Sequence, residues 1–187
     1  MIRAILTAAF LSLPIVLEDA GAESIKRFDV IVAGESYDGE MVPRNSRVFR
    51  QVSHAIQDVV VRSGYRSFDA YLNSEIDEST DRFYLDQICD TNSMIDSNNS
   101  VALLFSIHVS TRRYDFKNSA ILRLTGRIID CRTDEIYAAT EARSSDEVDL
   151  PIICPRECLI EEIGEKARGL GKHLGNMLVQ QLDRRIR

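Results

Sequence analysis

Hydrophobic and polar residues follow two spacings along the first half of the chain, and these predict alternating strands and helices. Residues 28–33 and 65–72 alternate in polarity, which is typical of a β-strand. Between them, apolar residues recur at helical spacing, from a capping residue near Ser46 to the glycine at Gly64. A shorter helix is expected from Asp81 to Cys89. This half of the chain therefore predicts a strand, a helix, a strand and a second, shorter helix.

The middle of the chain carries the clearest strand pattern. Residues 101–110 alternate regularly, and after a connection over 112–119 the alternation returns in 122–128. A short turn then leads to a third strand over 136–140, and residues 144–155 are expected to form a loop. Three consecutive strands with short connections predict an antiparallel meander with one buried face.

The last segment predicts a long amphipathic helix over residues 157–184, with an apolar stripe along one side. Ala167, Gly171 and Gly175 lie one turn apart on this helix and form a ladder of small residues. A glycine inside a helix costs roughly 1 kcal/mol relative to alanine, so a close approach should compensate for these two. We expect the ladder to pack closely on the sheet.

The full order of elements is β-α-β-(α)-β-β-β-α, where the parentheses mark the shorter helix. This order predicts an α+β fold with a mixed sheet whose C-terminal part is an antiparallel three-strand meander, packed by helices. Residues 23–187 show no internal repeat and are expected to form a single domain.

The N-terminus has the pattern of a secretory signal peptide, residues 1–22. Arg3 supplies the positive start, residues 4–17 are apolar, and a small-residue cleavage site ends at Ala22. The alternative is a buried first helix, which Pro14 would kink. The length of the leader and its short positive start are typical of bacterial export, so we expect cleavage near Ala22 and a periplasmic mature protein. No run of 18 or more apolar residues occurs, so no transmembrane segment is expected in the mature chain.

Composition and charge exclude some classes of partner. The chain has 187 residues, and 23 Lys and Arg against 29 Asp and Glu give a net charge of −6. An acidic chain lacks the basic surface that nucleic-acid binding requires, so no nucleic-acid partner is expected.

In an exported protein the four cysteines are expected to form disulfides, because disulfides are the usual state of cysteines in an oxidising compartment. Four cysteines allow three pairings. The spacing favours a small loop closed by Cys154 and Cys158, which leaves Cys89 and Cys131 for a long-range bridge. The alternatives are a thiol-redox role for Cys154 and Cys158, although three residues separate them instead of the usual two, or a zinc site.

No sequence motif for catalysis, phosphate binding or metal binding is present, so no catalytic residue, metal or cofactor is predicted. His108 lies two residues from Ser106 and from Ser110, a weak indication of nucleophile chemistry without an identifiable acid. Glu35 and Asp38 lie on a loop flanked by glycines and are expected to form a solvated turn. We therefore expect a protein that is not an enzyme.

Positive charge is concentrated along the predicted meander. The candidate partner-binding residues are Arg112, Arg113, Arg123, Arg127 and Arg132. An anionic partner, a glycan or an acidic protein surface, would suit them, and a solvated sheet face explains them equally well.

Residues 122–139 resemble the strand–turn–strand of the TolB amino-terminal-like group of periplasmic domains. The group's pattern of Gly-Arg, two apolar residues and Asp matches residues 126–130, and residues 133–135, Thr-Asp-Glu, follow where the group has Thr-Gly-Glu. The group includes the TolB N-terminal domain, the periplasmic domain of the CsgG secretion channel, the flagellar protein FlgT and the penicillin-binding-protein activator LpoB. The chain departs from it in lacking the lipidated cysteine of several members.

This resemblance implies a non-catalytic domain that binds protein partners in an envelope-spanning assembly, or packs into a homo-oligomeric ring. The leading hypothesis is therefore a periplasmic accessory or assembly factor of secretion, flagellar or cell-wall machinery. A thiol-redox factor using Cys154 and Cys158, and a glycan-binding module using the basic face, are the alternatives.

Overall fold

The computed structural model describes residues 28–35, 42, 46–70, 81–90, 99–113 and 117–186. The predicted signal peptide, residues 1–22, and Asp38 lie outside the described residues.

The described strands form one mixed sheet, in the order β2-β1-β3-β4-β5, with β6 paired to β4. β1 runs parallel to β2 and β3, and β3, β4 and β5 form an antiparallel meander. The predicted α+β fold with a mixed sheet is confirmed. The strands are β1 (Asp29–Gly34), β2 (Arg66–Asp69), β3 (Ser100–Arg113), β4 (Asn118–Asp130), β5 (Ile136–Arg143) and β6 (Val148–Leu150). The helices are α1 (Arg47–Arg62), α2 (Asp81–Asp90) and α3 (Arg156–Ile186).

The first helix begins and ends as its sequence predicts. The Ser46 hydroxyl accepts a hydrogen bond from the Phe49 amide at 3.2 Å, which caps α1. Gly64 adopts a φ of 84°, a left-handed conformation that glycine tolerates best, and the chain turns there into β2. In the chain, α1 therefore lies between β1 and β2, two parallel strands that pair with each other in the sheet.

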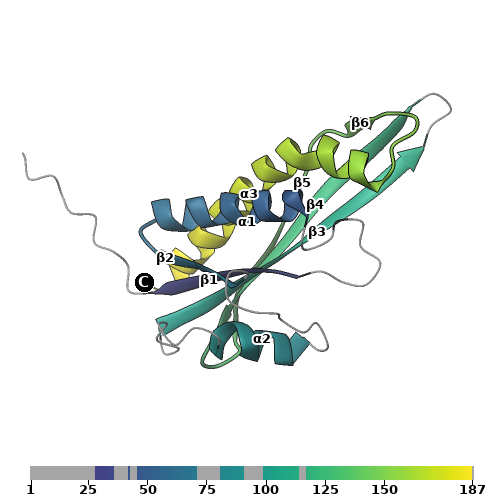
Figure 1. Cartoon of the computed structure of the whole chain (residues 1–187). Helices are drawn as coiled ribbons and strands as arrows, with labels where there is room; N and C mark the ends of the chain where they lie inside the picture. Colours follow the sequence, from purple (N-terminus) through teal and green to yellow (C-terminus); the bar gives the residue numbers. More distant parts are fainter. Residues whose placement is uncertain are drawn as a thin grey trace, which may run out of the picture.

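Helices cover both faces of the sheet (Figure 1). α1 and α3 lie on one face over the main core, where the rings of Phe49 and Phe105 pack with centroids 5.0 Å apart. α2 covers part of the opposite face, which we call the outer face, over a second core that includes Ile88 and Leu104. The prediction of one buried face is therefore wrong for the first half of β3. The alternation in its sequence could not reveal this, because Ala102 and Leu104 make both faces apolar there.

The small-residue ladder of α3 packs on a helix and not on the sheet. A Cβ atom built at Gly171 would lie 3.2 Å from the backbone oxygen of Val52, and one at Gly175 would lie 3.2 Å from Cβ of Val59. Both contacts belong to α1. The expectation that the ladder approaches the sheet is wrong, since the glycines allow two helices to cross closely above it.

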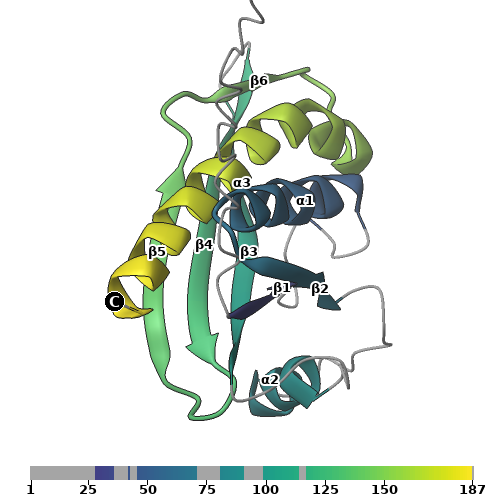
Figure 2. The ribbon, with the colours of Figure 1, turned by 90° about the vertical axis from the view of Figure 1, so that its left-hand side faces the viewer.

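The structure also adds a strand and lengthens all three strands of the meander. β6 forms inside the predicted loop 144–155, and β4 begins at Asn118, inside the predicted connection 112–119. Pairing of Asn118 with Leu150 joins the two additions at the end of β4 that is remote from α2 (Figure 2). A three-residue strand is too short to show an alternating pattern, so only its partner reveals it.

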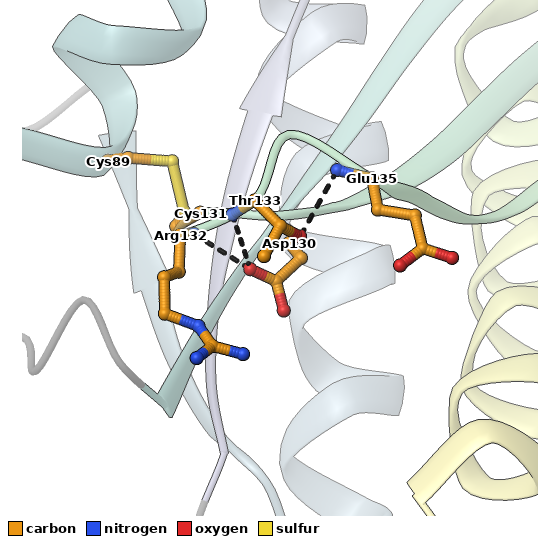
Figure 3. Close-up of a disulfide and its surroundings, with 6 residues drawn as sticks. All are labelled: Cys89, Asp130, Cys131, Arg132, Thr133 and Glu135. Atoms are coloured by element: carbon orange, nitrogen blue, oxygen red, sulfur yellow. Dashed lines mark hydrogen bonds between the residues drawn. A yellow bond between two sulfur atoms is a disulfide. The ribbon is translucent and has the colours of Figure 1, made fainter.

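Asp130 organises the turn between β4 and β5 (Figure 3). Its carboxylate accepts hydrogen bonds from the amides of Arg132 at 2.8 Å and Thr133 at 2.9 Å. It also accepts one from the Tyr137 hydroxyl. Asp134 follows with a φ of 58°, at the position where the TolB-like pattern has glycine. The carboxylate of Asp130 holds the turn through these hydrogen bonds. Aspartate also tolerates the left-handed conformation at position 134 better than most residues do.

We expect Asp130→Asn to lower the free energy of unfolding at pH 7 by about 1 to 2 kcal/mol. Burial acts to raise the pKa of Asp130, but the hydrogen bonds from Tyr137, Arg132 and Thr133 outweigh it and lower the pKa. A carboxylate with a lowered pKa in the folded state adds stability above its unfolded pKa, and loses it as the pH falls through the folded value. Urea titrations of both proteins should therefore converge under acidic conditions. A difference that persists unchanged in acid would contradict this assignment.

Candidate functional site

Residues 151–155, which we call the isoleucine loop, connect β6 to α3 and present two apolar side chains to solvent. Ile152 is 74% exposed and Ile153 is 88% exposed, the highest values for large hydrophobic side chains among the described residues. Single exposed apolar residues are common on protein surfaces and need no explanation. Two adjacent exposed isoleucines on a fixed loop indicate a contact surface instead.

The loop is braced on both sides. The Asn118 side-chain amide donates to the carbonyl oxygens of Pro151 at 3.2 Å and Ile152 at 2.7 Å. On the other side, the Cys154–Cys158 disulfide ties the loop to the first turn of α3. The isoleucines are therefore held away from the core by contacts that precede and follow them.

Ion pairs link the strands at the end of the sheet from which the loop leaves. Lys117 lies 2.6 Å from Asp149, and Arg112 lies 3.2 Å from Glu147. Glu147 also accepts a hydrogen bond from the Ser119 hydroxyl at 2.6 Å. Since most of these charged side chains are exposed, they add little stability.

The five predicted arginines do not form one surface. Arg112, Arg123 and Arg127 lie on the outer face, where each pairs with a carboxylate: Glu147, Glu141 and Glu35. Arg113 follows Arg112 in the strand and lies on the opposite side, and Arg132 lies in the turn at the far end of β4. Their role in partner binding stays a prediction.

All four cysteines are paired. The connectivity, Cys89 to Cys131 and Cys154 to Cys158, is the one that the spacing favours. The first bridge fastens α2 to the turn after β4 (Figure 3), and the second belongs to the isoleucine loop.

A depression of about 570 Å³ lies on the outer face where β3, β4 and β5 run side by side. We call it the outer-face depression. Its lining includes Glu35, Ser106, His108, Thr125, Arg127 and Glu141.

Hydrogen bonds connect the polar groups of this depression. The Ser106 hydroxyl lies 2.7 Å from Oγ1 of Thr125 and 3.1 Å from Nε2 of His108. Beside them, the Arg127 guanidinium donates to the Glu35 carboxylate. The sequence pattern singled out Ser106 and His108, and the structure brings them together, whereas Ser110 lies outside the lining. Thr125 and the Glu35–Arg127 pair were missed as members of one site, because only the sheet register shows that they meet.

Among the described residues, no three His, Cys, Asp or Glu side chains gather in a way that could hold a metal ion. In the same part of the chain, no helix is both long and apolar enough to cross a membrane.

Comparison with known proteins gives distant structural likenesses alone. No protein-family model and no curated protein sequence matches the chain. A solved homolog of the neuraminyllactose-binding hemagglutinin from Helicobacter pylori has 9% identity and a TM-score of 0.43, covering 83% of this chain and 85% of that one. The PelC dodecamer from Paraburkholderia phytofirmans has 8% identity and a TM-score of 0.43, covering 81% and 86%.

The rare lipoprotein B from Shewanella oneidensis has 8% identity and a TM-score of 0.41, covering 83% of this chain and 93% of that one. Likenesses of this strength carry no argument about the chain, and its membership of the TolB-like group stays a prediction.

Proposed function

We propose that the protein is an exported, non-catalytic accessory or assembly factor that binds protein partners of an envelope-spanning complex, with the isoleucine loop as its contact. The observation that carries the proposal is the exposure of Ile152 and Ile153 on a loop that is fixed on both sides. The resemblance of residues 122–139 to periplasmic assembly domains supports the choice of compartment and machinery.

The energetics of the loop suit a protein interface. Burying one isoleucine side chain contributes about 1.5 to 3 kcal/mol, so two of them can supply much of the binding energy of a moderate complex. Because Asn118 and the Cys154–Cys158 bridge already hold the loop, little conformational entropy is lost on binding.

The proposal is tested by placing a photo-crosslinking amino acid at position 153 in cells that make the protein. Crosslinked material is purified from the cell envelope and identified by mass spectrometry. The matched control carries the same amino acid at Val61, which is 57% exposed on α1 and distant from the loop in sequence. We expect envelope proteins to be captured at position 153 in preference to position 61. No capture, or equal capture at both positions, would contradict the proposal.

Substitution of Ile153 by serine should weaken recovery of the captured partner by tenfold or more, since the lost burial corresponds to at least about 1.4 kcal/mol. Val61→Ser, which changes another exposed apolar side chain, should leave recovery unchanged. The affinity of each purified variant for the identified partner, measured by calorimetry, decides the point. Equal affinities of Ile153→Ser and the unsubstituted protein would place the contact elsewhere.

A further inference from the structure

The outer face changes character along β3. Ala102 and Leu104 are buried under α2, and the next outward residues, Ser106 and His108, are polar. Ser106 is only 3% exposed, so its neighbours shield its hydroxyl from solvent. The change coincides with the outer-face depression, whose volume of about 570 Å³ falls within the range of small-molecule sites.

The polar groups of the depression are held in place before any ligand arrives. Ser106 is hydrogen-bonded to Thr125 at 2.7 Å and lies 3.1 Å from His108 Nε2, so three side chains on two strands fix one another. Glu35, which is 7% exposed, is held by Arg127. Groups fixed in this way lose little entropy on binding, which favours a specific site over a merely solvated surface.

The charges of the depression are balanced. Glu35 pairs with Arg127 within the lining, and Glu141 at the rim lies 3.8 Å from Arg123. Each pair neutralises its own charges, so neither an anionic nor a cationic ligand would meet an uncompensated opposite charge. Charge balance therefore favours a neutral ligand.

Four further residues complete the lining: Leu104, Gly126 and Ala139, which carry no polar side-chain group, and Thr140. A ligand that fits must therefore present both C–H surface and several hydroxyl groups. We propose that the outer-face depression binds a neutral, hydroxyl-rich small molecule, namely a sugar unit. This binding is separate from the contact made by the isoleucine loop, and it requires no protein partner.

The test is a titration of the purified, isotope-labelled protein, with both disulfides formed, followed by amide NMR. The neutral probes are glucose, N-acetylglucosamine and cellobiose, and the charged comparators are glucose 6-phosphate and glucosamine. We expect at least one neutral probe to shift the signals of residues that line the depression, such as Ser106, Thr125 and Ala139, in a saturable way. Shifts caused by the charged compounds alone, or no saturable shift with any probe, would overturn the proposal.

Variants then locate the site. Ser106→Ala and Thr125→Val each remove a hydroxyl from the lining and should weaken binding of the active probe by about three- to tenfold. Ser110→Ala, on the same face of the same strand but outside the lining, is the matched control and should bind normally. Thr125→Val keeps the test decisive if Ser106→Ala fails to fold. Equal weakening by Ser110→Ala, or unchanged binding by both lining variants, would overturn the proposal.

Discussion

Removal of the Cys89–Cys131 disulfide, by substitution of both cysteines with alanine, is expected to lower the free energy of unfolding by about 4 kcal/mol. The bridge joins residues that are 42 positions apart, and the chain-entropy cost of closing a loop of this length gives that estimate. Stabilities of single domains are typically about 5 to 15 kcal/mol, so the loss is a large part of the total.

The bridge also has a structural role, because it fastens α2 to the turn at the end of β4. Among the residues of α2 whose side chains are described, Leu85, Ile88 and Cys89 are the buried ones. Once the bridge is gone, only non-covalent contacts hold the helix on the sheet, and local opening of α2 is expected to become easier. Hydrogen exchange should therefore show faster exchange in α2 than in α1 of the double variant.

The matched control removes the other bridge. Cys154 and Cys158 are only four positions apart, so the same relation gives about 2 kcal/mol for their double alanine variant. Urea titrations of the two double variants and of the unsubstituted protein measure both losses. Equal losses, or a larger loss for Cys154 and Cys158, would show that the loop-length argument does not describe this protein.

Much of the fold could be predicted because its main elements have long, regular patterns. β3 and β4 alternate over many residues, and α1 has a capping serine at one end and a glycine at the other. The additional strand β6 and the second core under α2 could not be predicted in the same way. Both depend on a pairing between distant segments, Asn118 with Leu150 in one case and α2 with the outer face in the other.

The candidate sites were predictable only in part, for a related reason. Ser106 and His108 share a strand, so their proximity followed from an alternating pattern. Thr125 and Glu35 lie beside them because of the register in which the strands pair, and this register cannot be read from the sequence. Ile152 and Ile153 lay in a predicted loop, and their exposure depends on how Asn118 and the neighbouring disulfide hold that loop.

The close crossing of α1 and α3 leads to the second large effect. Gly171→Leu is expected to lower the free energy of unfolding by about 3 kcal/mol, because a side chain there meets atoms that cannot easily move. The Cβ atom of the leucine alone would lie 3.2 Å from both the backbone oxygen and Cγ1 of Val52. Leucine has a better helix propensity than glycine by somewhat less than 1 kcal/mol, which offsets only part of this cost.

Gly169 provides the matched control on the same helix, since no atom beyond the adjoining backbone of the helix itself lies within 4 Å of a Cβ built there. Gly169→Leu should therefore raise the free energy of unfolding by somewhat less than about 1 kcal/mol, through helix propensity alone. Thermal and urea unfolding of the two variants should give changes of opposite sign. If Gly171→Leu were as stable as the unsubstituted protein, α1 and α3 could separate at little cost, and the small residues of the ladder would need another explanation. Opposite signs would instead establish that the glycine at 171 is required by the helix crossing, and the one at 169 is not.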